Sequence, residues 1–189
     1  MSEPFLLHLM RHGEPVLTGR MLGRTDSPAT PAGIAACVGQ AAGLAVDHIL
    51  SSDLSRAVTC ADAIAGEGSA MSGDPRWREL DFGAWDGMAA SDIDPAALGR
   101  FWDDPDSCPP PGGERWSELL ARVTSAIADL PGGSALVVTH GGAMRAALAI
   151  LCGFALPQLW AFDLPYASVL SLRVWPGPAP SAQIVGLWT

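Results

Sequence analysis

The chain has 189 residues, of which 49% are hydrophobic, and its formal net charge at pH 7 is −9. This length suits a single domain with a sizeable core, and we expect one domain over residues 1–189. All 11 basic residues are arginine. An acidic chain without basic runs is unsuited to nucleic acid or an anionic membrane surface, so neither is expected as a partner.

The sequence also indicates the cellular compartment and the redox state of the cysteines. No apolar run is long enough to span a bilayer, and residues 1–10 lack the basic flank and cleavage site of a signal peptide, so we expect a cytoplasmic protein. The cysteines are scattered, with no CxxC pair, and predict reduced thiols rather than a disulfide framework or a zinc site: Cys37, Cys60, Cys108 and Cys152. The oligomeric state, a homodimer included, is left open.

The segment Phe5–Glu14 begins with an apolar run that ends in arginine, histidine and glycine. Such a run is typical of a strand buried on both faces, as in a parallel sheet. In open α/β sheets the ligand crevice lies beyond the carboxyl ends of strands. Arg11 and His12 are therefore candidates for binding a phosphate, and Gly13 allows the backbone to turn sharply or approach a ligand closely. His8, inside the run, is expected to be a core histidine.

The next segment predicts a helix, a strand and a second helix. Thr30 and Pro31 have the residue types preferred at a helix cap and at the first helical position. Residues 48–52 predict a short strand. Arg56 then lies in the first turn of a helix that reaches about Ala65, so a second polar group follows the end of a strand.

The middle of the chain is less regular. A short strand is expected at residues 70–72, and the aromatic, acidic and glycine-rich stretch 77–87 predicts a structured loop. Residues 92–113 contain several breakers and predict an irregular, lid-like insertion spanning about 88–115. The apolar positions between residues 116 and 130 follow helical spacing and predict an amphipathic helix.

The last part returns to regular structure. Residues 135–139 predict a buried strand, which His140 follows directly, and residues 144–152 predict an apolar helix. Residues 169–175 and 183–188 predict two strands around a Pro/Gly turn, paired antiparallel at the sheet edge.

Three buried strands therefore end in a polar group that is followed by a helix. Because the carboxyl ends of parallel strands meet at one rim, these groups are expected to gather there, with an acid from the aromatic loop: Arg11, His12, Arg56, His140 and Glu79. Each alone has a plainer interpretation, the histidines as core residues, Arg56 as a surface residue and Glu79 as a loop acid. The histidines lack HxH or HExxH spacing, so a metal centre is disfavoured.

Four segments resemble, in this order, the four motifs of the histidine phosphatase superfamily, the phosphoglycerate mutase-like group: Arg11–Glu14, Ser51–Ala57, Glu79–Gly87 and His140–Gly142. The resemblance covers essentially the whole chain. It implies an α/β fold of three α/β/α layers with a mostly parallel central sheet, an antiparallel edge and a short lid insertion. It also implies that neither metal nor cofactor is needed.

The resemblance implies a role for each rim residue. His12 would be the nucleophile that forms a phosphohistidine, a role that imidazole can fill when its ring nitrogen is unprotonated. Arg11 and Arg56 would bind the phosphoryl oxygens with planar forks, and His140 would donate to the same oxygens, either as a neutral ring or as an imidazolium. Glu79 would protonate the leaving alkoxide and then activate water.

Further positions are carried over from the same pattern. In addition, because they are apolar, the neighbouring Trp77, Phe82 and Trp85 would exclude water around Glu79 and so favour its protonated form. The backbone amides near Gly141 would add donors at a helix N-terminus. The loop after the first motif would contribute substrate-binding positions: Thr18, Gly23 and Arg24. Two positions depart from the family pattern, Thr18 where an asparagine is frequent and Cys60 where a threonine is common.

The expected partner is a small phosphorylated metabolite. The short chain favours a phosphatase over a mutase, whose insertion is usually larger. Three segments resemble α-ribazole phosphatases, which act in cobalamin assembly, and also broad-specificity phosphatases: Phe101–Trp102, Pro111–Arg115 and Leu159–Phe162. Phe101, Trp102 and Trp116 would stack a benzimidazole-like ring or pack within the lid. A phosphoglycerate mutase-type transfer and a non-catalytic phospho-ligand binding module remain as alternatives.

Overall fold

A computed structural model describes residues 3–66 and 73–189. These residues contain a five-stranded sheet of order β2-β3-β1-β4-β5. The strands are β1 Phe5–Arg11, β2 His48–Ser51, β3 Ala135–Thr139, β4 Val169–Trp175 and β5 Ser181–Trp188. β1 and β2 both pair parallel to β3, whereas β4 pairs antiparallel to β1 and to β5. The predicted mostly parallel sheet with an antiparallel edge is confirmed.

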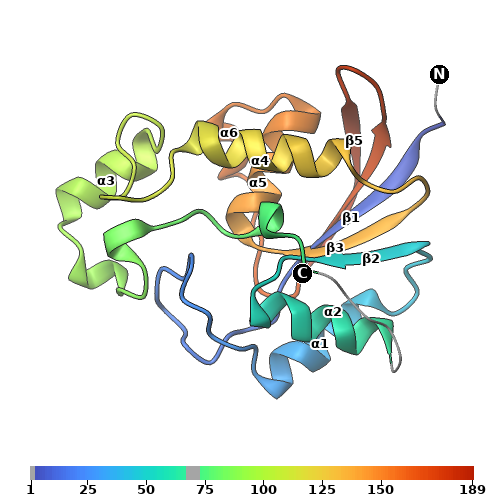
Figure 1. Ribbon diagram of the computed structural model, residues 1–189, viewed down its shortest axis with the longest axis horizontal. Coiled ribbons are helices and arrows are strands. Elements are labelled where there is room, and N and C mark those ends of the chain that lie inside the picture. The colour runs from blue at the N-terminus through green and yellow to red at the C-terminus, as the bar shows by residue number, and fades with distance from the viewer. Residues whose placement is uncertain (1–2, 67–72) are drawn as a thin grey trace.

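Helices cover both faces of this sheet (Figure 1). α1 Pro31–Ala41 and α2 Ser55–Ala65 lie on one face, while α4 Trp116–Ala128, α5 Gly141–Cys152 and α6 Leu156–Leu159 lie on the other. The side chains of β1 alternate between two hydrophobic cores: Leu7 and Leu9 belong to the core that includes α4 and α5, whereas Met10 belongs to the core under α1 and α2. This burial on both faces explains the continuous apolar runs of β1 and β3.

Most helix boundaries follow local signals. At α1 the Thr30 hydroxyl accepts a hydrogen bond from the Gly33 N–H at 3.0 Å, as the predicted cap requires. α5 begins at Gly141, three residues before the predicted start. Gly141 and Gly142 weaken the helical signal at this point, but their lack of side chains lets another segment dock on the helix end.

The prediction that residues 92–113 are irregular is wrong for the first half of this range, which contains a helix. α3 Pro95–Asp103 forms there because Asp94 caps it, accepting a hydrogen bond from the Ala97 N–H at 2.9 Å, and because Phe101 is only 3% exposed. α3 stands to one side of the sheet (Figure 1). The segment that precedes it holds three short 3-10 turns, η1 Pro75–Trp77, η2 Gly83–Trp85 and η3 Ala90–Asp92. The strand expected at residues 70–72 lies outside the described residues.

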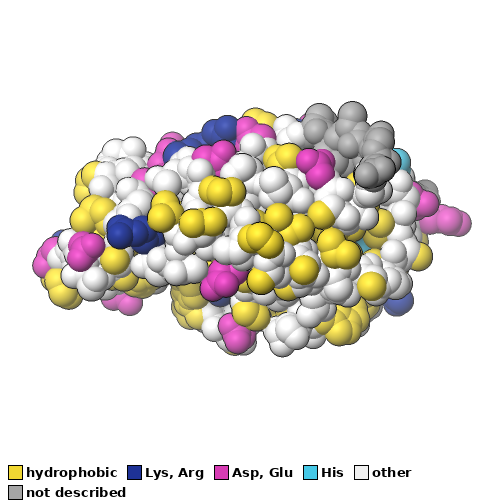
Figure 2. All heavy atoms as spheres, turned by 90° about the horizontal axis from the view of Figure 1, so that it is seen from below, with side chains coloured by type: hydrophobic (Ala, Val, Ile, Leu, Met, Phe, Trp, Pro, Cys, Tyr) yellow, Lys and Arg dark blue, Asp and Glu magenta, His cyan; other side chains and the backbone are white. Residues whose placement is uncertain are grey.

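The four cysteines are all free thiols, with Cys37 and Cys60 buried and Cys108 and Cys152 half-buried. Figure 2 shows the face that is turned downward in Figure 1, where hydrophobic side chains are frequent, acidic ones are scattered among them and the basic ones drawn stand at separate positions. Within residues 3–66 and 73–189, we find no helix with the length and apolar character needed to cross a membrane.

Candidate active site

The carboxyl ends of β1 and β3 bring the two motif histidines side by side. Arg11 is the register partner of Thr139, and the His12 N–H donates to the Thr139 carbonyl at 2.9 Å. The residues that follow, His12 and His140, therefore face each other with ring centroids 4.9 Å apart in an edge-on arrangement. Gly13 is required next to them, since a Cβ there would lie 2.3 Å from the Gly33 carbonyl of α1.

His12 is held as a neutral ring with a defined tautomer. Its Nδ1 lies 2.7 Å from the Gly13 carbonyl oxygen. Because a carbonyl only accepts, Nδ1 carries the proton and Nε2 keeps its lone pair. Burial, together with the positive charges of Arg56 and Arg11, lowers the pKa of His12 to about 3, although the Gly13 hydrogen bond acts in the opposite direction. At neutral pH this is the form of imidazole that can attack phosphorus.

His140 is fully buried, and its Nε2 lies 2.9 Å from the Ser52 hydroxyl. Its Nδ1 has no hydrogen-bond partner among the described residues. Burial foremost, and then a positive charge on His12 when it is protonated and the charges of Arg56 and Arg11, lower the pKa of His140 well below its ordinary value. This environment favours a neutral ring over an imidazolium, a choice that the sequence left open.

The two motif arginines occupy different positions. Arg11 extends from β1 over the Tyr166 ring, with its Cζ 4.2 Å from the ring centroid, and one of its Nη atoms donates to the Leu164 carbonyl at 2.7 Å. Arg56 is fully buried and donates to three backbone carbonyls of the loop at residues 22–25, at 2.8 to 3.1 Å. Arg11 lines the cavity in front of His12, whereas Arg56 supports the loop beside it.

Glu79 docks on the N-terminus of α5. Its carboxyl oxygens accept the Gly142 N–H at 3.0 and 3.1 Å and the Leu80 N–H at 2.8 Å. A Cβ at Gly142 would lie only 2.0 Å from the carboxyl, so the glycine makes the contact possible. The carboxyl is thus fixed by backbone donors at the positive end of a helix. Of the three aromatic residues expected to exclude water around it, Phe82 lines the same cavity, whereas Trp77 and Trp85 are core residues that do not, and their effect on water stays a prediction.

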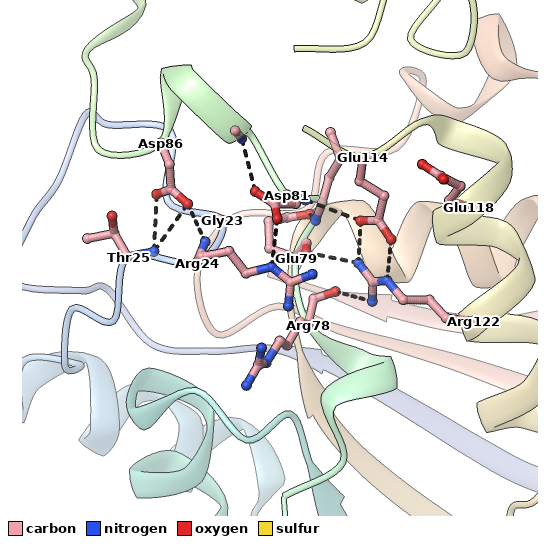
Figure 3. A network of polar contacts seen from close by, with 12 residues as sticks. Gly23, Arg24, Thr25, Arg78, Glu79, Asp81, Asp86, Glu114, Glu118 and Arg122 are labelled. Carbon is pink, nitrogen blue, oxygen red and sulfur yellow. Dashed lines mark hydrogen bonds and ion pairs between the residues drawn. The ribbon is translucent and has the colours of Figure 1, made fainter. Parts of the chain in front are cut away.

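Arg122 of α4 positions the backbone of Glu79 (Figure 3). Its guanidinium donates to the carbonyls of Arg76 and Arg78 at 2.8 Å and of Glu79 at 2.9 Å. It also pairs with Glu114 through two hydrogen bonds of 2.6 and 2.9 Å. Both side chains are mostly buried, 17% and 11% exposed. The ion pair between Arg122 and Glu114 therefore fixes the segment that carries Glu79. The helical spacing of residues 116–130 predicts the helix but does not indicate this role of Arg122.

The loop candidates do not reach the cavity. Thr18 is exposed, and Arg24 donates to the Asp81 carboxyl at 3.0 Å (Figure 3). Gly23 packs against the Glu79 segment, where a Cβ would lie 2.5 Å from the Leu80 carbonyl oxygen. None of these three lines the cavity. Their predicted binding roles remain predictions, whereas Gly141 does line it.

A cavity of about 250 Å³ opens in front of His12. Its polar lining includes Arg11, His12, Glu79 and the backbone of Gly141 and Gly142, and its walls are mainly apolar, with Phe82, Phe101, Trp102, Trp116, Leu119 and Trp160 among them. Sequence reasoning missed three polar lining residues, Arg20, Arg145 and Tyr166. A signal existed for Arg145, which is an isolated arginine in the apolar segment 144–152. Within the described part of the chain, no three His, Cys, Asp or Glu side chains are grouped as metal ligands.

The sequence matches the model of the family described as "Histidine phosphatase superfamily (branch 1)" over residues 7–181. The chain therefore belongs to the histidine phosphatase superfamily, and it is an enzyme of the phosphoglycerate mutase-like kind. The resemblance of its four motifs is confirmed at the level of the superfamily.

Particular relatives agree with this assignment. The chain is 34% identical over 160 residues to "Probable phosphoglycerate mutase GpmB" of Yersinia pestis (strain Pestoides F), a match that covers 78% of this chain and 74% of that protein. The solved structure of "Mycobacterial hydrolase 1" superimposes with a TM-score of 0.84 at 26% identity, covering 96% of this chain and 97% of the other. The structure of TTHB049 from Thermus thermophilus gives a TM-score of 0.75 at 32% identity, with 98% and 99% covered.

Proposed function

We propose that the chain is a metal-independent phosphomonoester hydrolase that acts through a phosphohistidine on His12. The observation that carries the proposal is the fixed tautomer of His12: Nδ1 is bound to the Gly13 carbonyl, and Nε2 is unprotonated beside Arg11 and the cavity. Buried histidines are often structural, but a structural ring would use both nitrogens for hydrogen bonds.

The reaction would proceed in two displacements. His12 Nε2 attacks phosphorus, the bond from phosphorus to the ester oxygen breaks, and Glu79 transfers its proton to that oxygen. Water then attacks the phosphohistidine, giving its proton to Glu79, and inorganic phosphate leaves with His12 restored. Arg11, with an Nε that has no partner among the described residues, and the N-terminus of α5 would stabilise the phosphoryl oxygens.

The substrate we favour is α-ribazole 5′-phosphate, an intermediate of cobalamin assembly. The alcohol that leaves from this substrate carries a flat aromatic base. Such a base suits cavity walls that include Phe101, Trp102 and Trp116. A second candidate is phosphoryl transfer between positions of a phosphoglycerate, which the name of the Yersinia relative favours. A transferase would have to retain the phosphoryl group, whereas an open cavity lets water enter.

The test is phosphate release without added metal from α-ribazole 5′-phosphate, 3-phosphoglycerate, a sugar phosphate and phenyl phosphate, by wild type and His12→Ala. We expect wild type to release phosphate, fastest from the ribazole ester, and His12→Ala to release none. Equal rates for all esters would refute the assignment of α-ribazole 5′-phosphate as the substrate, while the proposal of a hydrolase would still stand. Isomerisation of 3-phosphoglycerate without phosphate release would identify a mutase, and binding without turnover would identify a phospho-ligand binding module.

A further inference from the structure

Arg145 is a charged side chain in the apolar helix α5 that no step of the proposed reaction uses. Its Nη1 and Nη2 make only long hydrogen bonds, to the Gly141 carbonyl at 3.4 Å and to the Phe162 carbonyl at 3.3 Å. Its Nε is buried and has no partner among the described residues, which also contain no carboxylate in ion-pair contact with it. Arg145 is half-buried, and a half-buried cation with so few partners is costly unless an anion or another acceptor completes its site.

The cavity offers the place for such an acceptor. Arg145 lines it together with Arg11, and both guanidiniums approach the N-terminus of α5. From the point where a Cβ at Gly141 would stand, Arg145 Nη1 is 3.2 Å away and Arg11 Nε is 3.8 Å away. Among the described residues, three arginines line the cavity against one carboxyl group, although the chain as a whole carries a net charge of −9: Arg11, Arg20 and Arg145 against Glu79. When Glu79 is protonated, as the proposed reaction requires, these arginines carry three positive charges against the two negative charges of a phosphomonoester.

Arg145 and Glu79 meet on the first turn of α5, where Arg145 Nη1 donates to the Gly141 carbonyl and the Glu79 carboxyl accepts the Gly142 N–H. Burial lowers the pKa of Arg145, and Glu79 is the strongest of the charges that act on it. If Glu79 protonates the departing oxygen, Arg145 therefore faces the leaving group.

The guanidinium is also held in place. Its Cζ stacks 4.7 Å from the centroid of the Trp160 ring, and Trp160 meets Trp102 edge-on at 5.1 Å. Trp102 belongs to α3 and Trp160 follows the last residue of α6, and both line the cavity. A planar fork fixed against an aromatic face is suited to bidentate hydrogen bonding with an oxygen pair.

We propose that Arg145 binds an oxygen acceptor on the leaving group of the substrate, a carboxylate or a hydroxyl separated from the ester oxygen by a few carbon atoms. It is thus a specificity-determining residue of the proposed hydrolase, and this inference rests on that proposed function. A phosphomonoester whose leaving group carries such an acceptor is bound better than one whose leaving group is purely hydrocarbon.

The test uses phosphonates, because their C–P bond is not hydrolysed and binding can be measured apart from turnover. Three probes share one carbon chain: 3-phosphonopropionate carries a carboxylate, 3-hydroxypropylphosphonate a hydroxyl, and propylphosphonate neither. Phosphorus NMR titrations give the dissociation constants for wild type, Arg145→Gln and Arg145→Lys. The matched control is Arg100→Gln, which removes the same charge from an exposed position of α3 that does not line the cavity.

We expect Arg145→Gln to weaken binding of at least one acceptor-bearing probe about tenfold or more, with less than about a twofold effect on propylphosphonate. A loss confined to 3-phosphonopropionate identifies a carboxylate, and a loss on both acceptor-bearing probes identifies a hydroxyl as sufficient. Arg145→Lys should lose less than Arg145→Gln, because it keeps the charge without the fork. Arg100→Gln should change none of the three.

Equal weakening of all three probes would overturn the inference, since Arg145 would then act on the phosphoryl group or on the fold. Unchanged binding of all three would overturn it as well. Retained affinity for propylphosphonate shows that a variant is folded. Turnover of phosphomonoesters by wild type is scored separately: its absence would refute the proposed hydrolase, while a selective loss in the titrations would still support an acceptor site at Arg145.

Discussion

Replacing His12 with asparagine should make the stability of the protein less dependent on pH. In the unfolded chain the ring binds a proton near its ordinary pKa of 6.5, whereas in the folded protein burial lowers the pKa to about 3. Because the folded state prefers the neutral ring, the contribution of His12 to stability is fully present above 6.5 and is lost as the pH falls toward 3.

The size of the effect follows from this difference. Between the two pKa values the unfolded state binds one more proton than the folded state, which lowers the free energy of unfolding by about 1.4 kcal/mol per pH unit. Integrated from about pH 7.5 to about pH 5, this amounts to about 2 kcal/mol for His12 alone. His8, whose pKa is also lowered by burial, remains in the variant and contributes alike to both proteins. His140 keeps the burial that is the largest cause of its lowered pKa and loses only the smaller effect of a charged His12.

The assay is urea unfolding of wild type and His12→Asn at both pH values. We expect the loss of unfolding free energy on acidification to be about 2 kcal/mol smaller in the variant, whatever the difference between the two proteins near neutral pH. If the two proteins lose the same amount, His12 is not buried as a neutral ring, and the argument for an unprotonated Nε2 is wrong.

Two further variants test how Glu79 is positioned. Gly142→Ala places a Cβ within 2.0 Å of the Glu79 carboxyl, so we expect kcat for phenyl phosphate to fall at least about tenfold. Gly99→Ala, where a Cβ meets nothing within 4 Å, is the matched control and should leave kcat unchanged; equal effects would exclude the contact as the cause. Arg122→Leu leaves Glu114 buried without its partner and should cost about 3 kcal/mol in urea unfolding. A cost below about 1 kcal/mol would show that this ion pair does not hold the segment.

The sheet and the rim could be predicted because their signals are local. A run such as Ala135–Thr139 is apolar at nearly every position and is followed at once by His140, so the strand, its burial and the polar group at its end can all be read from adjacent residues. Parallel pairing then brings His12 and His140 together without further information.

The surroundings of those residues depend on contacts between distant segments. Arg56 binds carbonyls more than 30 residues away in the sequence, and Arg122 binds carbonyls more than 40 residues away. Such partners are set by how loops cross in space, which no periodicity records. Arg24 is turned away from the cavity for the same reason, since its partner Asp81 lies on a different loop.

The failure to predict helix α3 within the insertion has a local cause. The proline and aspartate residues after Asp103 are strong breakers, and in the sequence they obscure the Asp94–Pro95 start signal that precedes α3. The cap and the burial of Phe101 are enough to form a helix before those breakers end it.

The central claim is that His12 carries the phosphoryl group during the reaction. The most direct measurement is rapid quenching of the enzyme during turnover of phenyl phosphate, followed by mass spectrometry of its peptides under conditions that preserve phosphohistidine. The account predicts one added phosphoryl group on the peptide that contains His12, and the loss of this group after brief treatment with acid. Phosphate release by wild type with an unmodified His12, or undiminished release by His12→Ala, would contradict it.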